Sequence, residues 1–267
     1  MEGHLFYCQR ALFVFIETSL VLFAAGLIGY MIGHIVSGRV GERSQIGAVQ
    51  ASILGLLALM MGFTFAAASA RYDARRILAV EEANALGTTF LRAQTLPEPY
   101  RTRTSQMIRK YVDLRLQSIS VINNPKALAR VKSKTERLQQ DMWAQAAAAA
   151  RRYPNPITAI FLQTLNESID LYSARVAAFR NRVPDSVLWI LAFIAIAGLA
   201  ITGYSFGLSG QRDWIVLGLV SVLVAAVIIM IVDLDRPQTG PTKVSQQSMI
   251  DLRDSLSGFE AHSREVK

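Results

Sequence analysis

Four long runs of apolar residues alternate with polar segments along this chain. The runs lie at about residues 11–36, 46–70, 187–206 and 214–232. Each is close to the ~20 residues with which a helix crosses the ~30 Å hydrocarbon core of a bilayer. Short connections at 37–45 and 207–213 favour tight antiparallel pairing within the first two and within the last two runs. The pattern predicts four transmembrane helices in two hairpins.

A polar segment, residues 71–184, separates the two predicted hairpins. It shows no strand-like alternation, and Pro97, Pro125 and Pro156 each fit the first position of a helix. The latter two directly follow an asparagine that can cap the helix. No helix breaker separates the second apolar run from residues 71–96, so that helix is expected to continue beyond the bilayer.

The chain is therefore expected to be an all-α membrane protein with four transmembrane helices and a helical cytoplasmic domain inserted between the second and third. Its predicted parts are an N-terminal membrane hairpin (1–70), a basic helical cytoplasmic domain (71–184), a C-terminal membrane hairpin (185–233) and a cytoplasmic tail (234–267). The tail is expected to carry a short amphipathic helix at about residues 245–259.

Basic residues are concentrated in the middle segment. The formal net charge of the chain is +8, and residues 71–184 contain 19 Lys and Arg against 9 Asp and Glu. A basic patch can bind nucleic acid, but arginines that flank membrane helices follow the positive-inside rule instead. Nucleic-acid binding is therefore not expected. The even number of spans places both termini and the middle domain on the same side of the membrane, which the arginines identify as the cytoplasm.

Side chains suited to catalysis or metal binding are sparse. The histidines His4, His34 and His262 are scattered, Cys8 is the only cysteine, and no GxSxG motif or phosphate-binding glycine loop occurs. We therefore predict no enzymatic activity, no cofactor and no metal site.

Polar residues beyond the second span form the first candidate site. Arg71, Arg75 and Glu82 lie at offsets of 0, 4 and 11 and share one face of the continuing helix. Glu82 has no arginine four residues away on its own helix, so we expect it to pair across helices, with Arg175 as one candidate partner. Two interpretations stay open: a structural salt-bridge network, or a coupling or ligand-sensing network at the mouth of a pore. The polar-network candidates are Arg71, Arg75, Glu82, Asn84, Thr88, Asn166, Glu167, Asp170 and Arg175.

A stripe of small residues along the second span forms the second candidate site. Its members recur at seven-residue spacing and are Ala48, Gly55, Gly62 and Ser69. Small residues let helices approach closely, so helix packing is one interpretation of the stripe, as it is for the GxxxG step at Gly29 and Gly33 of the first span. The other interpretation is a face that lines a central pathway in an oligomer. The pore-lining candidates on this face are Ser52, Gly55, Leu59, Gly62, Ala66, Ser69 and Asp73.

Several short motifs resemble those of an uncharacterised bacterial family of membrane proteins, the bestrophin-like domain family. The motifs are Arg71-Tyr72-Asp73 with Arg75-Arg76, Glu82-Ala83-Asn84 with Gly87-Thr88, Leu91-Arg92, Asn166-Glu167, and Leu234-Asp235-Arg236-Pro237 with Gly240. They lie within about residues 47–252, which is most of the chain. The resemblance implies a four-span helical protein of the bacterial inner (plasma) membrane and, through the bestrophins, an oligomeric ion channel. The implied partners are membrane lipid, further copies of the chain and inorganic ions.

We therefore expect a multi-pass integral membrane protein that acts as an oligomeric bestrophin-like ion channel, with the second span lining the pore. The alternative is a non-conducting membrane scaffold or sensor whose basic cytoplasmic domain binds a protein partner or anionic lipid. Ion flux through purified protein in liposomes distinguishes the two.

Overall fold

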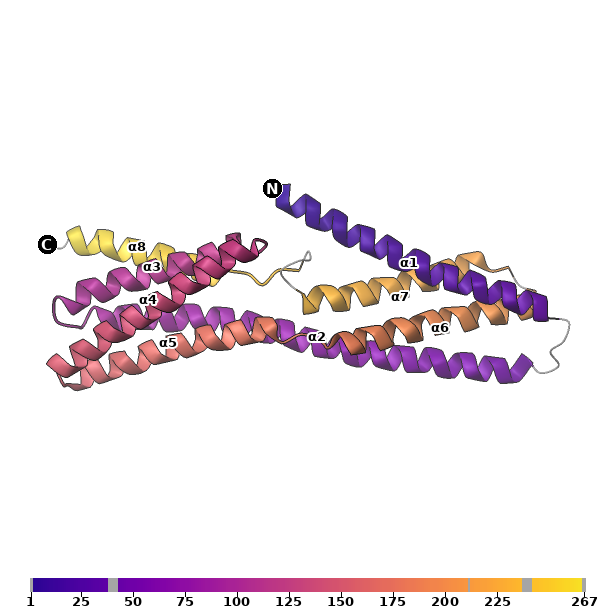
Figure 1. The fold of residues 1–267 in the computed structure, drawn as a ribbon, viewed down its shortest axis with the longest axis horizontal. Helices are drawn as coiled ribbons and strands as arrows, with labels where there is room; N and C mark the ends of the chain where they lie inside the picture. The colour runs from indigo at the N-terminus through magenta and orange to yellow at the C-terminus, as the bar shows by residue number, and fades with distance from the viewer. Residues whose placement is uncertain (1, 38–42, 211, 237–241, 266–267) are drawn as a thin grey trace. The chain divides into compact units, whose positions relative to one another are not determined.

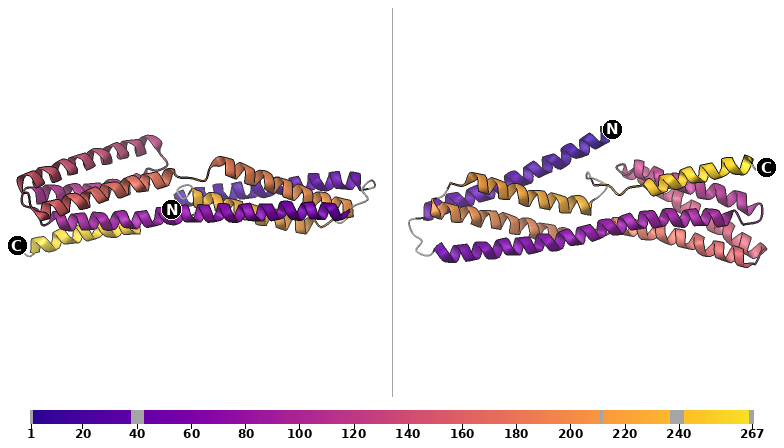
Figure 2. Two further views of the ribbon diagram at one scale, coloured as in Figure 1. Left: turned by 90° about the horizontal axis from the view of Figure 1, so that it is seen from below. Right: turned by 180° about the vertical axis from the view of Figure 1, so that it is seen from behind.

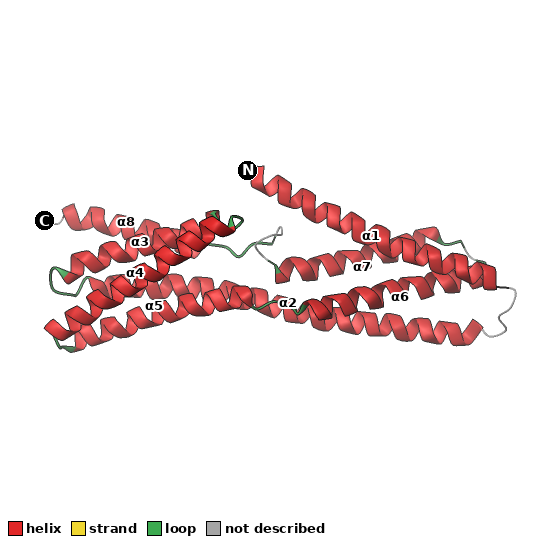
Figure 3. Ribbon diagram, in the orientation of Figure 1, coloured by secondary structure: helices red, strands yellow, loops and turns green. Residues whose placement is uncertain are grey.

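The computed structural model describes residues 2–37, 43–210, 212–236 and 242–265, and every regular element in these ranges is an α-helix (Figures 1 and 3). The helices are α1 (Glu2–Val36), α2 (Arg43–Ala93), α3 (Tyr100–Ser120), α4 (Pro125–Arg152), α5 (Pro156–Arg180), α6 (Asp185–Ser209), α7 (Trp214–Asp235) and α8 (Gln247–Glu265).

The chain folds into two compact units. The first, which we call the membrane unit, consists of Met1–Tyr72 and Asn181–Lys243. The second, which we call the helical unit, consists of Asp73–Arg180 and Val244–Lys267. Helix α2 contributes residues to both, because it continues without a break from residue 43 to residue 93.

Four helices are long and apolar enough to cross a membrane, which confirms the number predicted from the apolar runs. They lie within Leu12–Val36, Gln45–Ala93, Pro156–Ser209 and Trp214–Asp235. Large apolar side chains point outward from them, including Trp189 at 75% exposure and Ile215 at 86%. Such side chains are stable only against lipid or another protein surface.

Helices α1 and α6 of the membrane unit pack backbone against backbone. A Cβ atom added to Gly29 would lie 1.9 Å from the carbonyl oxygen of Ala200, and one added to Gly203 would lie 1.8 Å from that of Gly26. A Cβ added to Gly33 would lie 2.2 Å from the carbonyl oxygen of Tyr204. The GxxxG step predicted for packing on the first span therefore has that role, because only glycine allows this approach.

The ends of α6 and α7 are tied together by hydrogen bonds. The amide of Val183, just before α6, donates to Oδ1 of Asp235, the last residue of α7, over 2.9 Å. Pro184 occupies the N-cap position of α6, so a break separates α5, which ends at Arg180, from α6. Because Asp235 is almost fully buried, its carboxylate needs such a donor.

The helical unit is a bundle of the later part of α2 with α3, α4, α5 and α8 (Figure 2). Its core consists of buried apolar residues from all five helices, among them Leu86, Ile108, Met142, Phe161 and Met249. The predicted asparagine cap before Pro125 is present, since Oδ1 of Asn124 accepts from the amide of Ala127 over 3.1 Å.

One predicted helix start was wrong. Pro97 does not begin a helix; α3 begins at Tyr100. The carbonyl of Pro97 accepts hydrogen bonds from the amides of Tyr100 and Arg101, at 3.0 and 3.2 Å. A turn therefore precedes the helix, a local arrangement that a proline also favours.

The C-terminal helix α8 is part of the core of the helical unit. Met249 and Leu256 are buried, and the ring of Phe259 meets that of Phe90 edge to face at a centroid distance of 5.6 Å. A Cβ at Gly87 on α2 would lie 3.3 Å from the side chain of Leu252. The amphipathic helix expected in the tail thus has an apolar face that packs within this unit.

Replacing Gly203 with alanine should lower the free energy of unfolding by about 1–3 kcal/mol, because the new methyl group overlaps the backbone of α1 and pushes the two helices apart. Denaturant unfolding of the purified protein in detergent measures the change. Gly218→Ala is the matched control, because a Cβ there meets only a ring atom of Phe23 at 3.8 Å. Equal losses in the two variants would contradict the close α1–α6 packing.

Candidate functional site

A polar seam joins α2 to α5 in the helical unit. Arg75, Glu82 and Thr89 recur at seven-residue spacing on α2 and are all buried. Nε of Arg75 donates to the carbonyl oxygen of Ala178 over 3.0 Å. The hydroxyl of Thr89 lies 2.9 Å from that of Ser168. The two antiparallel helices are therefore held in one register by contacts along the whole seam.

Glu82 lies at the centre of this seam and binds two arginines. Nε and Nη2 of Arg115, on α3, donate to its two carboxylate oxygens over 2.6 and 3.0 Å. Nη1 of Arg175, on α5, donates to Oε2 over 2.5 Å. The cross-helix pair expected between Glu82 and Arg175 is therefore present, and the bidentate pair with Arg115 is additional.

Glu82, Arg115 and Arg175 form a cluster, which we call the Glu82 cluster, and this cluster also contacts the C-terminal segment. Nη2 of Arg175 also donates to Oε1 of Gln246, the residue before α8. The guanidinium of Arg115 stacks over the ring of Tyr172 at 4.7 Å, which adds a cation–π contact. Three helices of the helical unit (α2, α3 and α5) therefore meet at one carboxylate, and Arg175 links it to the residue before α8.

Electrostatics favour the ionised form of Glu82. Burial alone would raise the pKa of its carboxyl, but the charges and hydrogen bonds of Arg115 and Arg175 outweigh burial and hold the pKa below its ordinary value. Arginine stays protonated in proteins, so the cluster carries two positive charges against one negative. Nothing in this arrangement is suited to exchanging a proton near neutral pH. Its geometry is that of a buried ion-pair cluster.

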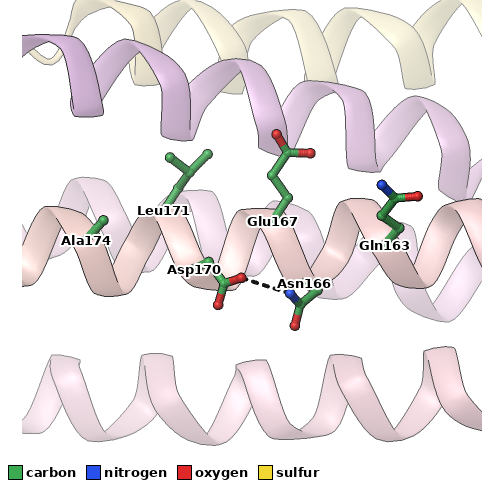
Figure 4. A pocket seen from close by; sticks show the side chains of 6 residues that line it. All are labelled: Gln163, Asn166, Glu167, Asp170, Leu171 and Ala174. Atoms are coloured by element: carbon green, nitrogen blue, oxygen red, sulfur yellow. Dashed lines mark hydrogen bonds between the residues drawn. The ribbon is translucent and has the colours of Figure 1, made fainter.

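The remaining polar-network candidates lie outside this cluster. Arg71 donates to the carbonyl oxygen of Ala67 on its own helix, and Asn84 and Thr88 are exposed. Asn166, Glu167 and Asp170 line a shallow groove on the outer face of α5 with Gln163, Leu171 and Ala174 (Figure 4). There the amide of Asn166 donates to Asp170 over 2.8 Å, and Glu167 points away from that pair.

The seven pore-lining candidates share the outward face of α2. Ser52, Gly55, Leu59, Gly62, Ala66 and Asp73 are exposed, and Ser69 is partly exposed. Within the described part of the chain, a Cβ added to Gly55 or Gly62 would meet no atom within 4 Å. The opposite side of α2 is buried, with Leu57, Thr64 and Ala68 each below 5% exposure. Nothing in the described part of the chain therefore packs against the two glycines of this face.

Two members of the cluster, Arg115 and Gln246, were not predicted from the sequence. A signal for Arg115 existed, because it follows Ile108 and Tyr111 on α3 at offsets of 7 and 4, which places it on the buried face. No comparable signal marks Gln246.

Among the described residues, no group of three or more His, Cys, Asp or Glu side chains is arranged to hold a metal ion.

Comparisons with known proteins agree with this architecture. The family model described as the bestrophin-like domain matches residues 18–249. A variant of a bacterial bestrophin homologue from Klebsiella pneumoniae has a fold similar to this chain, with a TM-score of 0.68, 14% identity, and coverage of 93% of this chain and 98% of that one. The structure of the homologue from the same organism determined by Zn-SAD phasing gives a TM-score of 0.65, 16% identity, and coverage of 92% and 96%. No curated protein matches the chain.

Replacing Glu82 with glutamine should lower the free energy of unfolding by about 3–5 kcal/mol near neutral pH, because two buried guanidiniums lose their counter-ion. Because folding lowers the pKa of Glu82 from its ordinary value of 4.5, the stabilisation is fully present above that pH and is lost as the pH falls further. The difference between wild type and variant should therefore shrink below pH 4.5. Unfolding in detergent across this range measures it.

Glu81→Gln is the control, since Glu81 is exposed on the same turn of α2. It should change the free energy of unfolding by no more than about 0.5 kcal/mol. If Glu82→Gln behaves like Glu81→Gln, the buried pair does not stabilise the fold.

Proposed function

This chain belongs to the bestrophin-like domain family, and from that membership we propose that several copies assemble in a bacterial inner membrane into an ion channel whose pore is lined by α2. The observation that carries the proposal is the outward face of α2, where small and hydroxyl-bearing residues are exposed or partly exposed and a Cβ at Gly55 or Gly62 would meet no atom within 4 Å in the described part of the chain.

The glycines of the membrane unit differ in what they contact, and this difference supports a role for α2 in contacts between copies of the chain. Gly29 and Gly33 of α1 and Gly203 and Gly207 of α6 lie against the backbone of the other helix. Gly55 and Gly62 of α2, by contrast, face open space in the described part of the chain. A membrane helix gains little from small residues that face only lipid. Further copies of the chain, or a water-filled path between them, account for this face.

Leu59 is the proposed constriction of that path. It lies at the middle of the exposed face, between Ser52 and Ala66, and is 54% exposed. A ring of such side chains around a shared axis can close a pore by dewetting. Asp73, two turns beyond Ala66, would set the electrostatic field at the inner mouth together with its neighbouring arginines.

The Glu82 cluster has a supporting role in this proposal. It holds the continuation of α2 against α3 and α5, so that the helix that lines the pore is anchored by charged hydrogen bonds. This favours the structural interpretation of the polar network over a ligand-sensing one, since both carboxylate oxygens of Glu82 already accept hydrogen bonds from Arg115 and Arg175.

Leu59→Ser should increase ion conductance in planar bilayers, because a polar side chain at the constriction favours wetting of the pore. Leu219→Ser is the matched control: this leucine on α7 is 56% exposed, and serine there should not open the pore. If neither variant conducts ions although its oligomers are correctly assembled, Leu59 does not act as a hydrophobic gate. That result would favour a non-conducting scaffold or sensor.

Both termini are expected in the cytoplasm, because the helical unit with its excess of cations is joined to membrane-spanning helices at both ends. Alkaline phosphatase fused after Lys267 should therefore be inactive in bacterial cells, and a cytoplasmic reporter at the same point should be active. An active phosphatase fusion would reverse the proposed orientation.

A further inference from the structure

We propose that the first turns of α4 bind the headgroups of anionic lipids at the membrane surface, through Lys126 and Arg130. This site goes beyond ion conduction and does not require the protein to conduct.

A stripe of four cations follows one exposed face of α4. Lys126, Arg130, Lys134 and Arg137 lie at offsets of 0, 4, 8 and 11, which an α-helix places on one side. All four are exposed. The face that α4 buries is a different one and carries Val131, Leu138 and Met142.

This stripe is electrostatically unfavourable in the isolated chain. Cations at i and i+4 repel each other, and Lys126 adds positive charge to the positive end of the helix dipole. None of the four has an ion pair or side-chain hydrogen bond within the residues that the structure describes. By contrast, Lys132 on the adjoining face pairs with Glu136 at 3.5 Å. An anion on the stripe would relieve this repulsion.

Within the helical unit, the turn before α4 lies beside the first residues that α2 contributes to this unit. Contacts between α2 and α3 fix their antiparallel register: Gln94 with Ser105 and Glu82 with Arg115. Continuing that register, the turn between α3 and α4 at residues 121–124 is level with about residue 75 of α2. Residue 75 lies about five residues, or ~8 Å, along α2 from Ala70, which is the last residue of the apolar run and directly precedes Arg71.

Headgroups occupy ~5–8 Å on each side of the hydrocarbon core, so the turn and Lys126 are at their outer edge. Arg130 lies ~6 Å further along α4, which is within the ~8–10 Å over which salt screens charges. Lys134 and Arg137 lie ~12 and ~16 Å beyond Lys126, past that range. The first two cations can therefore attract lipid headgroups strongly, and the last two only weakly.

The turn itself supports a lipid surface over a soluble anion as the partner. Ile119, Val121 and Ile122 are only partly buried there, directly before the stripe. Partly exposed aliphatic side chains beside cations are typical of segments that lie at a membrane interface. The occupant that matches both features is an anionic lipid.

The test uses the full-length protein in liposomes of phosphatidylcholine and phosphatidylglycerol. With Cys8 replaced by serine, a fluorophore is attached at Asn123→Cys in the turn, and its quenching by brominated lipid of either class is compared. The label should be quenched more by brominated phosphatidylglycerol. A label at Pro154→Cys, in the turn at the other end of α4, should be quenched by neither lipid.

Lys126→Gln with Arg130→Gln should lower the preference for phosphatidylglycerol by about fivefold per cation, or roughly thirtyfold for both. The control pair Lys134→Gln with Arg137→Gln should lower it by less than about fivefold. An unchanged preference in the first pair, equal losses in both pairs, or an absence of quenching at position 123 would overturn the site. Displacement of the lipid by millimolar inorganic phosphate would instead identify a site for soluble anions and overturn the lipid assignment.

Discussion

A carboxylate buried without partners would destabilise a bundle by several kcal/mol, and the helical unit is arranged so that Glu82 has two. Arg115 and Arg175 reach it from α3 and α5, and Arg175 also bonds Gln246 at the start of α8. Because guanidinium and carboxylate groups pair in a narrow range of geometries, these contacts fix the register of the helices. Apolar packing alone would permit helices to slide by a turn at much lower cost.

The membrane unit depends on a different constraint. In lipid no hydrophobic effect drives helices together, so close packing must come from shape, and glycine supplies it. Helices α1 and α6 use glycines in this way, since Gly29 and Gly203 lie directly against the backbone of the other helix. Gly55 and Gly62 of α2 have the same character without an internal partner. The two groups of glycines thus differ only in whether a neighbouring helix of the described chain lies against them.

The buried arginines of the helical unit differ from the exposed cations of α4 in the partners that they have. The buried arginines are balanced by Glu82 or bonded to backbone carbonyl oxygens, as Arg75 is to Ala178. Lys126, Arg130, Lys134 and Arg137 on the exposed stripe of α4 have no ion pair within the described part of the chain. Unbalanced charge on a surface acts on whatever lies outside the molecule. For a protein with four membrane-length helices, the nearest dense source of negative charge is the lipid headgroup layer.

The sequence by itself determined the four membrane-length helices and the cap before Pro125, because hydropathy and capping depend on residues close together in the chain. It also indicated that Glu82 needed a partner from another helix. It misplaced the start of α3 at Pro97, since a turn and a helix start have similar local signals. Only the tertiary structure identified Arg115 and Gln246 as members of the cluster and distinguished the glycines that pack within the chain from those that do not. Both depend on distances between helices that are remote in sequence, which no local pattern encodes.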